Sequence, residues 1–119
     1  MYTMNFTNNS DMPLFKCIIE GSKKAEGRIA SEYVRSFKVG EELLLKSSDD
    51  YIVCKILYLN FYKSFEEMLT AEGFKNMIPF VNSFEEAVSV YKKFPGSERV
   101  TTMGCCAIGV EYVRGNVHI

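Results

Sequence analysis

Apolar residues recur at every second position in the middle of the chain, over residues 51–61 ("YIVCKILYLNF"). This period, together with the many β-branched and aromatic residues, is typical of a β-strand. The interleaved positions Val53, Leu57 and Leu59 are also apolar, so both faces of the strand are expected to be covered. The set expected to face the core is Ile52, Cys54, Ile56 and Tyr58.

Three further segments have strand patterns. The sequence predicts a short strand over residues 26–29 and another over residues 42–46, which follows a turn at Gly40. A closing strand is predicted within residues 104–113 ("GCCAIGVEYV"), where apolar residues again alternate. The apolar face predicted for this strand consists of Cys106, Ile108, Val110 and Tyr112.

The segment from Asp11 to Gly21 has the spacing of a short helix. Asp11 is suited to the N-cap, Pro13 to the first turn and Gly21 to the C-terminal end. Residues 1–11 are expected to form a loosely held N-terminal segment. The apolar stripe of the helix consists of Leu14, Phe15, Ile18 and Ile19.

Two later helices are predicted from capping boxes, in which a serine precedes a glutamate by three residues. Ser64 and Glu67 begin the first of these helices, and Ser83 and Glu86 begin the second. The helices are expected to end near Gly73 and before the pair Pro95-Gly96.

The order of these elements is helix, strand, strand, strand, two helices and strand, which predicts an α+β fold. Short connections in the first half favour a small, mainly antiparallel sheet or barrel with helices packed beside it. A length of 119 residues suits a single domain with one core.

Composition and charge restrict the class of protein. Hydrophobic residues make up 47% and charged residues 24%, which is ordinary for a globular domain. A net charge of −1 excludes a strongly basic nucleic-acid binder as a description of the whole molecule. Residues 16–38 nevertheless hold six basic residues against three acidic ones. The sequence therefore allows a polyanion to bind one face.

The four cysteines and the single histidine, His118, lack the spacing of a metal site, so no metal and no cofactor is expected. The cysteines are interpreted as buried free thiols of a reducing cytosol. No apolar run approaches the length of a membrane span, and the first ten residues lack an apolar leader. The expectation is a soluble, cytoplasmic or otherwise intracellular protein with no membrane partner.

The most unusual stretch is the charged segment "EGSKKAEGR", residues 20–28. Lys23, Lys24 and Arg28 could donate to phosphate or carboxylate, and Arg28 could do so bidentately. Gly21 and Gly27 allow backbone amides to approach a ligand. In a strand, Glu26 and Arg28 share one face. From these residues alone, the alternative is a solvated turn with one Glu–Arg ion pair.

Glu26, placed between cations, is expected to stay ionised. It could accept hydrogen bonds from a base or a sugar hydroxyl, or it could be a general base. Exposed aromatic side chains near this segment or after the long strand could stack on bases, although core packing is the alternative for each of them. These are Tyr33, Tyr58, Phe61 and Tyr62.

The octapeptide "GSKKAEGR" fits the Gly-x-Lys-x-x-Glu-x-Arg signature of ASCH domains, a group of PUA-like β-barrels. Four further segments follow in the order of that family: "KVGEELLL", "VCKILYLNFYKSFEEMLTAEG", "SFEEAVSVYKKF" and "GCCAIGVEYV". The resemblance covers about residues 12–113. It implies a small barrel of five or six mainly antiparallel strands, flanked by helices, with a cleft beside the motif.

The resemblance also implies RNA or modified-nucleoside recognition, since some small ASCH members are ribonucleases or acetylcytidine amidohydrolases. Lys23, Glu26 and Arg28 match the lysine, glutamate and arginine of the signature. The amidohydrolases are expected to have a threonine nucleophile where this chain has Glu26, which is a departure from their pattern. Glu72 matches a distant acidic residue of the family, and Tyr62 and Ser64 match a segment near the cleft. The alternative role for Ser64 is that of a helix cap.

Three functions remain open from the sequence. The favoured one is binding of single-stranded RNA, a nucleotide or a nucleoside by the motif residues. The second is a metal-free hydrolase in which Lys23 activates the attacking group or stabilises an oxyanion, while Glu26 or Glu72 activates water. The third is a protein-interaction adaptor. Alanine variants of Lys23 and Glu26 are expected to fold and to lose ligand binding or turnover.

Overall fold

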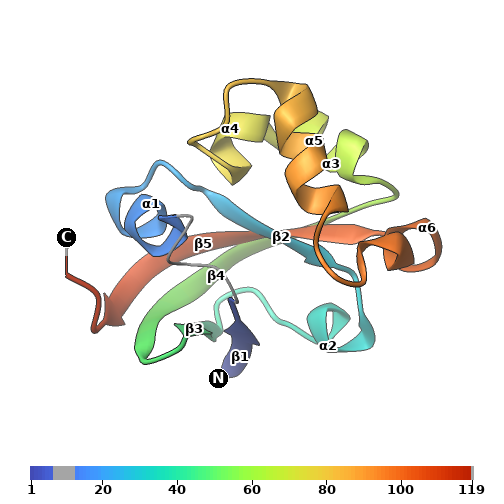
Figure 1. The fold of residues 1–119 in the computed structure, drawn as a ribbon. Coiled ribbons are helices and arrows are strands. Elements are labelled where there is room, and N and C mark those ends of the chain that lie inside the picture. The colour runs from blue at the N-terminus through green and yellow to red at the C-terminus, as the bar shows by residue number, and fades with distance from the viewer. Residues whose placement is uncertain (7–12, 119) are drawn as a thin grey trace.

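The computed structural model describes residues 1–6 and 13–118. Six α-helices, one 3₁₀ helix and five strands are assigned within this described part of the chain (Figure 1). In chain order they are β1 (Tyr2–Asn5), α1 (Leu14–Glu20), β2 (Ala25–Ile29), α2 (Glu32–Arg35), β3 (Glu42–Ser47), β4 (Asp50–Tyr62), α3 (Phe65–Glu72), α4 (Phe74–Met77), α5 (Phe84–Lys92), η1 (Ser97–Arg99), α6 (Val100–Met103) and β5 (Cys105–Gly115).

The five strands form one curled sheet in the order β1-β3-β4-β5-β2, which has the shape of a half-barrel (Figure 1). β1 runs parallel to β3, and the other neighbours are antiparallel. Helices α3, α4 and α5 lie together over one face of the sheet, near β2. The predicted α+β class, with a small barrel-like sheet flanked by helices, is confirmed and is compatible with a PUA-like barrel.

Two apolar cores lie on opposite faces of the sheet. The inner core fills the curl of the half-barrel, and the helix core lies between the sheet and helices α3–α5. Buried inner-core residues include Met4, Phe6, Phe15, Ile18, Leu43, Leu45, Ile52, Cys54, Ile56, Cys106, Ile108 and Val110. Buried helix-core residues include Ala25, Phe65, Met68, Leu69, Met77, Ile78, Val81, Ala87, Tyr91, Cys105 and Ala107.

The central strand β4 was predicted to direct Ile52, Cys54, Ile56 and Tyr58 to one face. The first three do lie in the inner core, but Tyr58 packs against the helix core, so its predicted placement is wrong. The reason is a register shift between Ile56 and Tyr58, where Leu57 is an extra residue relative to β5. Beyond this bulge, Tyr58, Asn60 and Tyr62 all lie on the helix side.

Two helix starts were predicted correctly from their capping boxes. The Ser64 hydroxyl accepts a hydrogen bond from the Glu67 backbone N–H, and the Ser83 hydroxyl accepts one from Glu86. Helix α1 begins at Leu14, and Gly21 ends it in the left-handed region with φ of 87°. Asp11, the residue expected to cap α1, lies outside the described residues.

The N-terminal segment was expected to be loose over residues 1–11, of which residues 7–11 lie outside the described part of the chain. The expectation is wrong for Tyr2–Asn5, which form β1 and pair with β3. Met4 is buried in the inner core, and the Tyr2 ring stacks on Phe37 at 4.4 Å between centroids. These apolar contacts hold β1 in place, although a strand of four residues is too short to show a clear alternation in the sequence.

All four cysteines are free and buried, as expected. Among the described residues, no cluster of three or more His, Cys, Asp or Glu side chains could hold a metal ion. No helix in the described ranges is long and apolar enough to cross a membrane.

Candidate functional site

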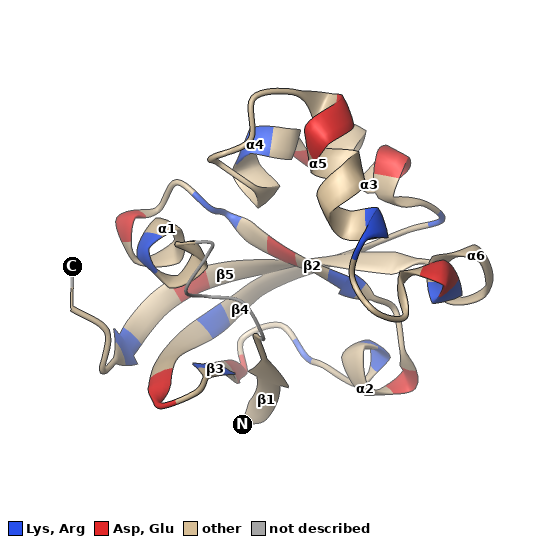
Figure 2. Ribbon diagram, in the orientation of Figure 1, with Lys and Arg blue, Asp and Glu red and all other residues tan. Residues whose placement is uncertain are grey.

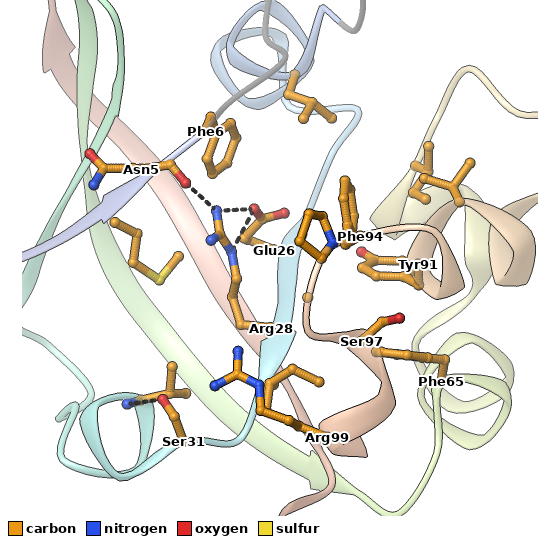
Figure 3. Close-up of a pocket in the computed structure, with 18 of the residues that line it drawn as sticks. Asn5, Phe6, Glu26, Arg28, Ser31, Phe65, Tyr91, Phe94, Ser97 and Arg99 are labelled. Carbon is orange, nitrogen blue, oxygen red and sulfur yellow. Dashed lines mark hydrogen bonds and ion pairs between the residues drawn. The ribbon is translucent and has the colours of Figure 1, made fainter. Parts of the chain in front are cut away.

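A pocket of about 490 Å³ opens where the two ends of the curled sheet face each other (Figure 3). Strand β1 and helix α2 form one wall, β2 forms the floor, and α5 with the following loop forms the opposite wall. This volume falls within the range of small-molecule sites. The segments that supply the lining are residues 3–6, 23–34, 78–80 and 90–99, together with Leu14 and Phe65.

Three charged residues of the sequence motif meet on the floor of this pocket. The Glu26 carboxylate is held between two cations: its Oε1 lies 3.2 Å from Lys23 Nζ, and its Oε2 lies 3.0 Å from Arg28 Nη2. The Arg28 Nε also donates to Oε2, at 3.2 Å. Lys23 is 2% exposed and Glu26 is 7% exposed, so this ion pair is almost fully buried.

The Lys23 ammonium has a partner for each of its three N–H groups. Besides the pair with Glu26, it donates to the backbone carbonyl of Ala25 at 2.8 Å and to that of Met77. These bonds tie the start of β2 to the end of α4. Because its donors are all engaged within the protein, Lys23 positions Glu26 and leaves ligand contact to other groups.

Burial and charge act in opposite directions on the two partners. Burial lowers the pKa of Lys23, and this outweighs the opposing effect of the Glu26 carboxylate. Burial alone would raise the pKa of Glu26, but the charges of Lys23 and Arg28 together outweigh it and lower that pKa below 4.5. Glu26 is therefore a carboxylate at neutral pH. It has about four acceptor positions, and the protein occupies three of them.

The lowered pKa of Glu26 predicts acid sensitivity. The folded state favours the ionised form, so its contribution to stability is present above pH 4.5 and is lost as the pH falls below it. In the double variant Lys23→Met with Glu26→Gln, the free energy of unfolding is expected to fall less steeply than in wild type as the pH decreases below 4.5. The difference in slope is at most about 1.4 kcal/mol per pH unit.

Urea unfolding of both proteins at a series of pH values from neutral to acidic measures this difference in the pH dependence of the free energy of unfolding. Glu42 and Glu66 also have lowered pKa values, but they are present in both proteins and cancel in the comparison. Parallel pH profiles would contradict the prediction.

Arg28 connects the two ends of the sheet. Its Nη2 donates to the backbone carbonyl of Asn5 in β1 at 3.2 Å, and its guanidinium lies 4.9 Å from the ring centroid of Phe6 (Figure 3). The Nη1 group has no partner among the described residues. Arg28 therefore closes the gap between β1 and β2 and keeps an unused pair of donors beside the pocket.

The walls add aromatic surface and a further cation. Phe80 and Phe94 are each 39% exposed, and Tyr33 is 49% exposed. Arg99 lines the mouth, and its Nε is held by the backbone carbonyl of Gly96. Among the lining residues, three cations stand against the single carboxylate of Glu26. The pocket is thus positively charged although the whole chain has a net charge of −1.

The outer edge of β2 supplies backbone groups to the same pocket. The Lys24 carbonyl accepts from Val110, and the Ala30 N–H donates to Gly104, both on the β5 side. Because backbone groups alternate between the two edges of a strand, the N–H and C=O groups of the odd-numbered residues 25–29 lie on the opposite edge. Among the described residues, the Gly27 carbonyl and the Ile29 N–H have no partner. Both residues line the pocket, so an acceptor and a donor lie beside Glu26.

The structure brings together some of the predicted site residues and separates others. Lys23, Glu26 and Arg28 line the pocket. Gly21 and Lys24 do not line it; Lys24 is exposed, and its backbone N–H donates to Asn76. Lys24 immediately precedes β2, which begins at Ala25, and its backbone carbonyl still accepts a hydrogen bond from Val110 of β5.

Glu72, Tyr62 and Ser64 lie outside the pocket lining. The Glu72 carboxylate accepts hydrogen bonds from the Tyr58 hydroxyl at 3.1 Å, the Asn60 amide at 2.9 Å and the Tyr62 hydroxyl. Burial and the Glu72 charge raise the pKa of Tyr58 to about 12. Glu72 thus fastens α3 to β4, and Ser64 acts as a helix cap.

Sequence reasoning missed the wall formed by α5 and the segment that follows it. Tyr91, Phe94 and Arg99 come from the end of α5 and the loop after it, more than 60 positions from the motif. The Tyr91 ring packs in the helix core. The one sequence feature related to this wall is Gly27. A Cβ atom at this position would lie 2.7 Å from the Tyr91 hydroxyl, so only a glycine lets the Tyr91 ring pack this close to β2.

The fold and the buried motif together define an α+β half-barrel with a charged pocket, and two solved structures share this fold. The crystal structure of hypothetical protein PH0355 has a TM-score of 0.83 and 33% identity, covering 94% of this chain and 98% of that one. The solution NMR structure of protein PF0455 from Pyrococcus furiosus has a TM-score of 0.71 and 29% identity, covering 94% and 96%.

At this identity over nearly the full length, the chain belongs to the same family as PH0355. Neither a family model nor a curated protein matches the sequence.

Proposed function

We propose that the protein is an ASCH-type domain whose pocket binds a nucleotide, either free or within single-stranded RNA. The observation that carries this proposal is a pocket with three cations, one buried carboxylate and exposed aromatic side chains. The ordered resemblance of the sequence to ASCH domains supports the same class of ligand.

The pocket offers separate groups for the two parts of a nucleotide. Arg28 Nη1 and the exposed Arg99 guanidinium are available to a phosphate, which Arg binds well because of its planar set of donors. Phe94 and Phe80 offer ring faces to a base. The remaining acceptor position of Glu26 suits an amino or imino N–H of that base. The Gly27 carbonyl and Ile29 N–H add a second donor–acceptor pair.

A metal-free hydrolase is the second candidate, because the Glu26 carboxylate lines the pocket; its lowered pKa makes it a weaker base than a free carboxylate, which ranks this candidate second. A carboxylate with one acceptor position left could accept a proton from an attacking water. In this mechanism Lys23 orients Glu26 and does not itself contact the substrate, because its donors are engaged. Glu72 has no part in it, since it does not line the pocket.

A panel of nucleosides, nucleoside 5′-monophosphates and short RNAs tests both candidates. Thermal shift reports binding, and mass spectrometry on the same samples reports turnover. The variants are Arg28→Lys and Arg99→Ala, with Arg114→Ala as the matched control because Arg114 pairs with Glu42 away from the pocket.

Loss of one charged hydrogen-bond donor is expected to weaken phosphate-containing ligands about tenfold or more. Binding that is equal in wild type, Arg28→Lys and Arg99→Ala would overturn the pocket assignment. A mass change that is lost in Glu26→Gln would favour the hydrolase, and stabilisation without a mass change would favour the binding module.

A further inference from the structure

A second, shallower hollow lies next to the pocket. The two share a ridge, because Val34 and Arg99 line the pocket while their chain neighbours Arg35 and Val100 line the hollow. In Figure 1, α2 and α6 lie near the same end of the half-barrel, where β4 ends and β5 begins. The hollow is lined by Arg35, Phe61, Tyr62, Lys63, Glu67, Val100, Thr101, Thr102, Met103 and Gly104.

Phe61 provides a flat apolar surface in this hollow. Its side chain is 43% exposed, and it belongs to neither of the two cores. The Arg35 guanidinium lies over one face of the ring, 4.9 Å from the centroid. An exposed phenylalanine held in this way presents a ring to solvent with little freedom to reorient.

Arg35 is itself fixed in place by two backbone carbonyls. Its Nε donates to Ala30 at 3.0 Å, and its Nη2 donates to Met103 at 2.9 Å. Nη1 has no partner among the described residues, so Arg35 retains donors for an anion. The guanidinium and the ring thus form one preorganised unit, which we call the Phe61 platform.

The charge around the Phe61 platform suits a polyanion. Arg35 and Lys63 supply two cations, and the acidic member of the hollow, Glu67, is engaged by the backbone N–H of Lys63 at 3.1 Å. The exposed residues Thr101 and Thr102 line the same hollow, and their hydroxyls donate to the backbone carbonyls of Glu98 and Arg99. Cations beside an exposed ring are the combination that single-stranded nucleic acid requires, namely phosphate contacts and base stacking.

We propose that the Phe61 platform is a second nucleotide subsite, which receives the base adjacent to the one held in the pocket. This inference rests on the proposed function and deepens it: the ligand is a single strand of at least two nucleotides, and a mononucleotide fills only half of the site. Stacking on an open ring needs an unpaired base, so a duplex is excluded from the platform.

The test compares ligand lengths in the full chain. Isothermal titration measures the dissociation constants of the four nucleoside 5′-monophosphates and of dinucleotides that contain the best of them at either position. Wild type is expected to bind one of these dinucleotides about tenfold or more tightly than the monophosphate. Phe61→Ala is expected to lose this gain and to leave monophosphate binding unchanged, and Phe61→Trp is expected to retain it.

Tyr51→Ala is the matched control, since Tyr51 is an exposed aromatic residue of the same strand outside both hollows. Equal affinity for mono- and dinucleotides, or a gain that survives Phe61→Ala, would overturn the second subsite and leave the proposed function intact. Absence of all nucleotide binding, or binding unaffected by Arg99→Ala, would overturn the proposed function and the subsite with it. Melting curves of each variant confirm folding.

Discussion

Replacement of Glu26 by alanine is expected to lower the free energy of unfolding by about 3–5 kcal/mol. The change leaves the Lys23 ammonium, which is 2% exposed, without its counter-charge and only 3.2 Å from where that charge was. Arg28 also loses its carboxylate partner, so two cations then face each other across a buried site. Urea unfolding at pH 7 measures the loss.

The matched control removes both charges of the pair. The double variant Lys23→Met with Glu26→Leu is expected to recover most of the lost stability, because no uncompensated charge remains buried. Glu42→Ala, which breaks an exposed ion pair with Arg114, is expected to have little effect. A Glu26→Ala protein as stable as wild type would show that the buried pair contributes nothing to folding.

A variant of Lys23 or Glu26 that loses stability would also lose ligand binding through unfolding. From the sequence, alanine variants of Lys23 and Glu26 were expected to fold and to lose only function. The bonds from Lys23 to Ala25 and Met77 make the residue part of the structure as well. Substitution at Arg99 is therefore the better test of ligand binding, because this side chain is exposed and its Nε donates to Gly96 in the same turn, whereas Arg28 also connects β2 to β1.

Replacement of Gly104 by alanine is expected to cost about 3 kcal/mol or more in unfolding free energy, the sum of two effects of about 1–3 kcal/mol each. Gly104 has φ of 74° and ψ of −170°, a backbone conformation that residues with a side chain rarely adopt. An added Cβ would also lie 2.6 Å from the backbone carbonyl oxygen of Tyr62, which cannot rotate away. Chemical denaturation measures the total.

Gly40→Ala separates the two effects. Gly40 has φ of 92°, but no atom lies within 4 Å of the added Cβ, so this variant reports backbone strain alone. Its cost is expected to be clearly smaller than that of Gly104→Ala. Equal costs at the two positions would mean that the contact with Tyr62 relaxes without penalty.

Much of the fold could be predicted because its signals are local. The capping boxes at Ser64 and Ser83 place helix starts within one residue, since a hydroxyl three positions before an N–H is enough to form the bond. The alternation of Cys106, Ile108 and Val110 likewise gives the face of β5 that lies in the inner core. Period and capping depend on neighbours in sequence, which a single sequence contains.

The face of Tyr58 could not be predicted, because a bulge depends on the partner strand. Residues 56–59 are all apolar, so the sequence shows no break there, and only the pairing with β5 shows that Leu57 is extra. Strand β1 was missed for a related reason. Its four residues are held by pairing with β3 and by contacts of Tyr2 with Phe37, which are distant in sequence.

For the candidate site too, the features that depend on local sequence were predicted and those that depend on distant residues were not. Glu26 and Arg28 were placed on one face from the strand period alone, and the structure brings Lys23 to the same carboxylate. Glu72 was predicted to lie near that pair only because it matches a family residue, and the structure places it outside the pocket lining. The Tyr58, Asn60 and Tyr62 side chains that hold Glu72 away from the pocket depend on the Leu57 bulge.

The contact between Arg28 and Asn5 means that the seam of the half-barrel is fastened by a side chain and not by a ladder of backbone bonds. β1 and β2 are the two edge strands, and β1, with only four residues next to the N-terminus, is the one expected to fray more readily. When it frays, Asn5 and Phe6 leave Arg28, and the pocket loses a wall in the same event. The integrity of the pocket is thus coupled to the attachment of the first six residues.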